Sequence, residues 1–211
     1  MPTEEKPEHW RKRAEIVEVI VLALVAIATA WSGFQGTAWG GHQAFLYGRA
    51  STERFAADAE ATLGGQQVVA DASMFTAWLQ ARDAGDEELQ RQLEGRFSPD
   101  YRTAFEDWLA TDPFSNPDAP PGPGYMPGFH NPHLAEAERL NAKASSFFDR
   151  GTEAREIANK YVRDTVLFAT VLFLIAVAQR FTIRNIRIGA NAVAIGLLVL
   201  TLVTVITLPR M

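Results

Sequence analysis

Four polar side chains lie in or beside the most apolar part of the first 50 residues. These residues are Glu18, Gln35, His42 and Gln43. Carboxylate and amide groups are costly at membrane depth unless they meet water or a bonding partner, so together they could line a polar path for ions or small solutes. In an oligomeric pore, a ring of Glu18 carboxylates would attract cations.

A structural interpretation of the same residues is simpler, and we favour it. Each Gln would bond to a neighbouring helix, and Glu18 would lie at the membrane surface beside Arg11 or Lys12. Polar groups near an interface cost less than polar groups at the midplane. Packing is therefore the expected role of this stretch, and the polar path is the alternative.

A weaker candidate for chemistry is a metal site formed by His130, His133 and Glu136. Residues 133 and 136 share one face of a helix, and imidazole and carboxylate groups are common zinc ligands. No motif supplies a fourth ligand, and a proline-rich corner often carries solvated His side chains. We therefore expect no metal and no other cofactor.

Motifs of enzymes and of nucleic-acid-binding proteins are missing from the sequence. It contains no phosphate-binding loop, nucleophile elbow or HExxH pattern. The absence of cysteine excludes thiol chemistry and Cys metal sites. The segment 33–161 has 11 Lys and Arg against 19 Asp and Glu residues, so it offers no basic patch for nucleic acid. We expect a protein that is not an enzyme and has no catalytic residues.

Three uncharged runs predict the membrane topology. They cover residues 19–41, 165–179 and 188–209. At about 1.5 Å of rise per helical residue, the first and third are long enough to cross a hydrocarbon core of about 30 Å. The second has 15 residues, but Tyr161, Arg163 and Arg180 can reach the interfaces from its ends. Glu15 and Glu18 interrupt the approach to the first run, which argues against a cleaved signal peptide.

Positive charge predicts which way the chain crosses the membrane. The tail 1–14 is rich in Lys and Arg, and the connection 181–187 carries Arg184 and Arg187 without any acidic residue. Both features are typical of cytoplasmic segments. The long acidic segment between the first two spans then faces the periplasm or the cell exterior. We expect a multi-pass protein of the bacterial inner (cytoplasmic) membrane, with the lipid bilayer as its first partner.

The segments around the spans read as helices. The first span, 15–41, is expected to continue outward to about residue 63, where Gly64 and Gly65 would end the helix. An outer helical domain follows over 66–133, and its strap, 112–133, holds seven of the eleven prolines. A long helix over 134–180 starts after Asn131 and Pro132 and includes the second span. The third span is 188–209.

Two patterns of spacing predict how the long helices pack. On the later helix a heptad seam consists of Ala137, Leu140, Ala144, Phe147, Gly151, Ala154, Ala158, Tyr161, Thr165 and Phe168. On the first helix, every fourth residue is small: Ala28, Ser32, Gly36, Gly40, Ala44 and Gly48. Small side chains let helix backbones approach closely, so we expect this second set to form a packing groove.

Three stretches of the sequence carry a resemblance to a known group of proteins. They occur in the order ATAWSGFQGTAWGGHQA, FEDWLATDPFSNPDAP and YVRDTVLFATVLFLIAVAQRF. From Ala28 to Phe181 the chain resembles a group of uncharacterised bacterial multi-span membrane proteins. The resemblance implies a multi-pass topology and a bacterial origin. It transfers no site residues, because no function is established for that group.

We therefore expect an all-α membrane protein with three transmembrane helices and a helical extramembrane domain between spans one and two. Three spans bury little surface by themselves, so a homo-oligomer is expected. The expected function is that of an oligomeric structural, interaction or accessory subunit, whose partners are its own copies and another membrane protein rather than nucleic acid. The alternative is an oligomeric channel for ions or small solutes.

Overall fold

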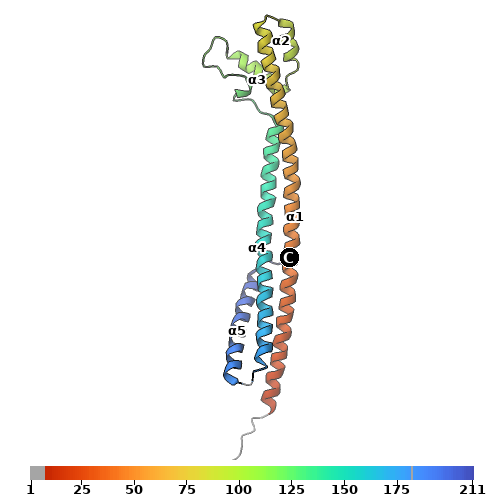
Figure 1. Cartoon of the computed structure of the whole chain (residues 1–211), viewed down its shortest axis with the longest axis vertical. Helices are drawn as coiled ribbons and strands as arrows, with labels where there is room; N and C mark the ends of the chain where they lie inside the picture. Colours follow the sequence, from red (N-terminus) through yellow and green to blue (C-terminus); the bar gives the residue numbers. More distant parts are fainter. Residues whose placement is uncertain (1–7, 182) are drawn as a thin grey trace, which may run out of the picture. The chain divides into compact units, whose positions relative to one another are not determined.

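Long helices dominate the fold. The computed structural model describes the backbone of residues 8–181 and 183–211, and the side chains of 16, 19–181, 183 and 185–211. The elements are α1 (Glu8–Asp83), α2 (Glu87–Glu94), α3 (Pro99–Ala110), the short 3-10 helix η1 (Pro123–Tyr125), α4 (Pro132–Ala178) and α5 (Arg184–Thr207) (Figure 1). Every regular element in these ranges is a helix, which confirms the predicted all-α fold.

α1 is continuous through the point where the sequence predicted its end. Gly64 and Gly65 lie inside the helix, and the helix predicted from residue 66 is its last part, so that prediction was wrong. A Cβ at Gly64 would lie 2.8 Å from Cγ of Leu134, so glycine here lets the start of α4 approach closely. The left-handed residue that follows the helix is Gly85, with φ of 72°.

α4 and α5 begin earlier than predicted. Pro132 is the first residue of α4, and the side-chain oxygen of Asn131 accepts a hydrogen bond from the Leu134 N–H at 3.1 Å, as an N-cap does. α5 begins at Arg184, so both Arg184 and Arg187 belong to the helix. The connection predicted at 181–187 is correspondingly shorter.

Three helices are long and apolar enough to cross a membrane. Candidate spans lie within Val19–Asp83, Pro132–Ala178 and Asn185–Thr207. Only 22%, 33% and 17% of their most apolar windows are buried inside the chain. Most of this apolar surface is therefore available to a lipid bilayer.

The chain consists of two compact units. The span unit is Met1–Tyr47 with Phe148–Met211, and the central unit is Gly48–Phe147. The core of the span unit joins residues of α1, α4 and α5, namely Val25, Phe168, Val171, Ile175 and Ala194. Burial of such side chains from three helices holds the span unit together.

The central unit has an aromatic core. It contains Trp78, Phe97, Tyr101, Phe105 and Trp108. The strap residues contact this core: the Trp108 indole N–H donates to the Pro120 carbonyl at 2.7 Å, and the Phe129 ring lies edge-on to Tyr101 at 5.6 Å. Such paired rings add to the energy of burial. The proline-rich segment is thus packed on α1 and α3 rather than solvated along its whole length.

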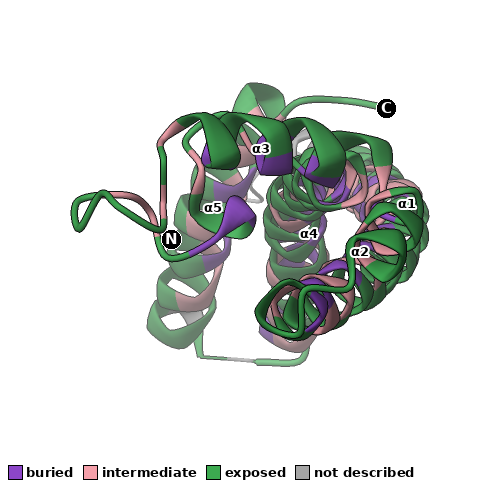
Figure 2. Cartoon of the chain, turned by 90° about the horizontal axis from the view of Figure 1, so that it is seen from above, coloured by how far each residue is buried: buried purple, intermediate pink, exposed green. Residues whose placement is uncertain are grey.

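Buried residues of α1 and α4 follow heptads. On α1, steps of seven connect Val25 with Ser32 in the span unit, and Ala50, Ala57, Gly64, Asp71 and Trp78 in the central unit. On α4, all ten residues of the predicted seam are buried or half-buried, which confirms that seam. Figure 2 shows that the buried positions of these helices gather on one side of each. This is the pattern of helices paired in a coiled coil.

Candidate functional site

The most conspicuous polar groups of the span unit lie in the interior between its helices. Ser32, Gln35, Asp164 and Thr201 have no exposed surface. They come from α1, α4 and α5, the three helices that carry the candidate spans. Buried polar groups require hydrogen-bond partners, so these residues and their partners form the candidate site.

Gln35 binds the main chain of the last residue of the sequence. Its side-chain oxygen accepts a hydrogen bond from the Met211 N–H at 3.0 Å, and its side-chain NH₂ donates to the Met211 carbonyl at 3.4 Å. Both functions of the amide are therefore used. The contact ties α1 to the segment that follows α5.

Two aromatic side chains hold the same segment one step earlier. The Trp39 indole N–H donates to the Pro209 carbonyl at 3.1 Å, and the Tyr161 hydroxyl donates to the same oxygen at 3.2 Å. α5 ends at Thr207, so the main chain beyond it has no helical partners and must find others. We call Gln35, Trp39 and Tyr161 the tail clamp.

Asp164 is a buried carboxylate that sequence reasoning missed. One of its oxygens accepts a hydrogen bond from the Thr204 hydroxyl at 2.9 Å, and the other accepts two from the Arg163 guanidinium at 3.0 and 3.1 Å. Asp164 thereby links α4 to α5. The available signal was an acidic residue directly before the uncharged run 165–179, where an unpaired charge is costly.

Ser32 stands apart from its polar neighbours. Its Oγ is the one buried side-chain oxygen or nitrogen in the described part of the chain that has no hydrogen-bond partner. It was predicted as a packing residue, and its small volume suits that role. A buried hydroxyl without a partner costs about 1–3 kcal/mol.

The predicted polar path is not assembled in the span unit. The side chain of Glu18 lies outside the described residues. Gln35 is occupied by the tail clamp, whereas His42 and Gln43 are half-buried and the His42 ring lies edge-on to Trp39 at 6.0 Å. A groove of about 120 Å³ between α1 and α5 is lined by apolar residues: Val21, Leu24, Val25, Ala28, Leu198 and Leu202.

The small-residue series of α1 packs only in its first half. Ser32 and Gly36 are buried, and a Cβ at Gly36 would lie 3.3 Å from Val162. Ala44 and Gly48 are exposed, and a Cβ at Gly40 or Gly48 would meet nothing within 4 Å. With 3.6 residues per turn, each step of four residues drifts by about 40°, so about 200° accumulate between Ala28 and Gly48. A continuous groove over the whole series was therefore a wrong expectation.

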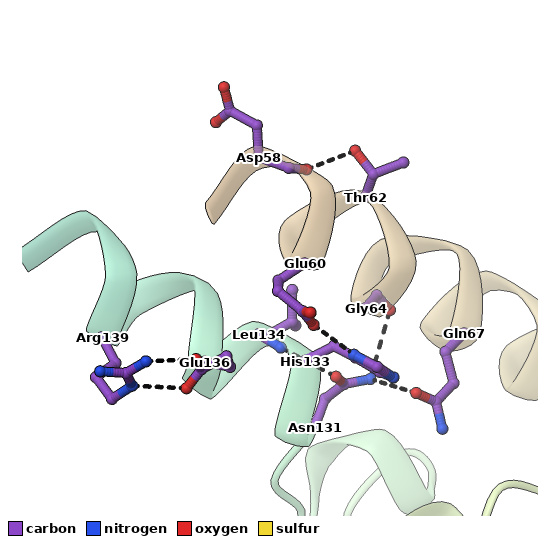
Figure 3. Close-up of polar contacts among 10 residues, drawn as sticks. All are labelled: Asp58, Glu60, Thr62, Gly64, Gln67, Asn131, His133, Leu134, Glu136 and Arg139. Atoms are coloured by element: carbon purple, nitrogen blue, oxygen red, sulfur yellow. Dashed lines mark hydrogen bonds and ion pairs between the residues drawn. The ribbon is translucent and has the colours of Figure 1, made fainter. Parts of the chain in front are cut away.

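The metal candidates are separated by their own partners (Figure 3). The Nδ1 atom of His133 lies 2.6 Å from a carboxylate oxygen of Glu60. Both carboxylate oxygens of Glu136 accept hydrogen bonds from Arg139, and this pairing lowers the pKa of the Glu136 carboxyl. Among the described residues no three His, Cys, Asp or Glu side chains are grouped as metal ligands would be, and His130 joins neither pair.

Fold and contacts together define an all-α protein with three candidate membrane spans and a separate helical unit. Comparison with protein-family models, curated proteins and solved structures finds no match to the chain. The function therefore has to be inferred from the contacts themselves.

Proposed function

We propose that this protein is a non-enzymatic integral membrane protein that works as an oligomeric structural, interaction or accessory subunit. Its proposed place is the bacterial inner membrane, with the amino-terminal tail in the cytoplasm and the central unit outside. Membership of the group of uncharacterised bacterial membrane proteins that the sequence resembles belongs to the same proposal.

The observation that carries the proposal is the use of Gln35. The amide that was the leading candidate for a polar path spends both of its hydrogen-bonding functions on the main chain of Met211. Asp164 is likewise engaged with Thr204 and Arg163. Polar groups that connect helices in this way serve assembly of the span unit.

An oligomeric channel for ions or small solutes is the second candidate. Asp164 is the observation that favours it, because ionisable side chains inside membrane spans often mark ion or proton pathways. The structural role ranks first, since both carboxylate oxygens already have donors in the same chain.

Flux from liposomes separates the two functions. Purified wild-type protein should release neither K⁺ nor a small dye faster than protein-free liposomes at any applied voltage, while a pore-forming peptide serves as the positive control. Asp164→Asn should lower the thermal stability of the protein in detergent without creating flux. Wild-type flux that Asp164→Asn alters would establish the channel and overturn the structural proposal.

A further inference from the structure

A second stripe of α1 in the central unit lies exposed. Its residues recur by threes and fours, and all of them are exposed: Gly48, Thr52, Phe55, Ala59, Thr62, Gln66, Val69, Ser73 and Thr76. We call this set the outer stripe. The side chains of Phe55 and Val69 are 75% and 66% exposed. No member of the outer stripe is charged.

Charged residues of the same stretch of α1 lie on the inner seam instead. Glu53 pairs with Lys143 at 2.8 Å and Glu60 with His133 at 2.6 Å. Asp71 accepts hydrogen bonds from Ser98 at 2.6 and 2.9 Å. A helix whose outer face meets only water has the opposite arrangement, with its charges outward. The outer stripe therefore has the composition of a surface that is covered.

The spacing of the outer stripe identifies what can cover it. From Gly48 to Thr76 the three-and-four spacing runs for about four heptads, or about 42 Å at helical rise. Sustained heptads of this length predict pairing with another helix. Phe55 and Val69 would supply the large contacts, and the small residues between them would let the two backbones approach.

We propose that the outer stripe packs in parallel against the outer stripe of a second copy of this chain. This rests on the proposed function: copies inserted in one membrane share one orientation, so their α1 helices run parallel and each stripe residue faces its own copy. Charges at such positions would repel one another, and the outer stripe has none. Asp58 flanks it, but the parallel register sets Asp58 opposite Leu63 of the second copy rather than opposite another Asp58.

Crosslinking through single cysteines tests this pairing, because the wild-type chain has no cysteine. Ala59→Cys places a thiol on the outer stripe. Ala61→Cys places one at an exposed position of α1 on a different face, and serves as the matched control. Mild oxidation of the full-length purified protein should link most Ala59→Cys chains into dimers, at least ten-fold more than Ala61→Cys.

A charge substitution supplies the second measurement. Phe55→Glu would set two carboxylates against each other in the parallel pair, and should weaken self-association at least ten-fold by native mass, while Phe55→Leu should not. Phe55 is exposed within its own chain, so the melting of the separated chain should change little.

The outcomes distinguish this inference from the proposed function. Equal crosslinking of both cysteine variants, or none, in a protein whose native mass is oligomeric would overturn the outer-stripe pairing alone. A native mass of one chain for the wild type would overturn both the pairing and the oligomeric part of the proposed function.

Discussion

Gln35 shows what a single amide can do inside a helical unit. Its side chain has no exposed surface, and it pairs with the Met211 main chain much as one backbone amide pairs with another. Gln43, eight residues later on the same helix, is only half-buried. Eight residues correspond to a rotation of about 80° beyond two turns, which is enough to take Gln43 off the inner face.

Gln35→Leu should destabilise the span unit by about 1–3 kcal/mol, because the N–H and carbonyl of Met211 lose their partner. The matched control is Gln43→Leu, which should change stability by no more than about 0.5 kcal/mol. Denaturant unfolding of the full-length protein in mild detergent would measure both. Equal losses for the two variants would show that the tail clamp does not depend on Gln35.

Tyr101 makes the stability of the central unit depend on alkaline pH. Burial, with a smaller contribution from the nearby Asp71 carboxylate, raises the pKa of Tyr101 to about 12. The neutral phenol is favoured in the folded state, so its contribution is complete below the unfolded-state pKa of about 10 and is lost as the pH rises towards 12.

Tyr101→Phe should therefore reduce the loss of stability between pH 10 and pH 12, by up to about 2 kcal/mol relative to the wild type. Tyr125→Phe is the control, because Tyr125 is exposed in the same unit. Circular dichroism melts at steps between pH 9 and pH 12 would measure the difference. Identical pH profiles for the wild type and Tyr101→Phe would contradict the assignment to Tyr101.

At the scale of elements, contact between α1 and α4 depends on glycines that are not equivalent. A Cβ at Gly151 would lie 2.5 Å from ring carbons of Tyr47, whose hydroxyl hydrogen-bonds with that of Thr152 at 3.2 Å. The Tyr47 ring also stacks on Phe148 at 5.2 Å. The ring is thus held in place, and Gly151 makes room for it.

Gly151→Ala should destabilise the protein by about 1–3 kcal/mol through overpacking against Tyr47. Gly40→Ala, where the added methyl group meets nothing within 4 Å, should be neutral or stabilising by up to about 1 kcal/mol. Thermal unfolding in detergent would compare the two variants. A loss at Gly40 that matches the loss at Gly151 would show that helix propensity in this environment, rather than close contact, governs both sites.

Helix periodicity explains which elements were predictable from sequence. The α4 seam was confirmed because alternating steps of three and four follow the helix, whereas the four-residue series of α1 drifts off its face. Gly64 and Gly65 looked like a helix end because the sequence does not reveal that Leu134 packs against Gly64. Asp164 and the tail clamp depend on contacts between distant segments, which spacing along one helix cannot predict.

At the scale of the whole molecule, the candidate spans carry most of the apolar surface. Three long helices have windows with mean hydropathy of 1.8, 1.8 and 2.3, and little of each window is buried within the chain. A bilayer would cover that surface without further folding. The orientation proposed above then determines which connections face each side.

Labelling of single cysteines with a membrane-impermeant maleimide should report that orientation. Gly65→Cys and Met211→Cys should react on intact bacterial spheroplasts, and Asn185→Cys should react only after lysis. All three positions are exposed, so packing does not hide them. Labelling of Asn185→Cys on intact cells, or protection of Gly65→Cys, would reverse the proposed orientation or change the number of spans.

The bond between Gln35 and Met211 also has a consequence during biosynthesis. The two residues are 176 positions apart, so α1 is made long before its partner leaves the ribosome. At about 5–20 residues per second, the interval is roughly 10–35 s. Until then the Gln35 amide must be hydrated or held by another component of the insertion machinery. A nascent chain interrupted before residue 209 would keep a polar defect in α1, which marks it as unfinished.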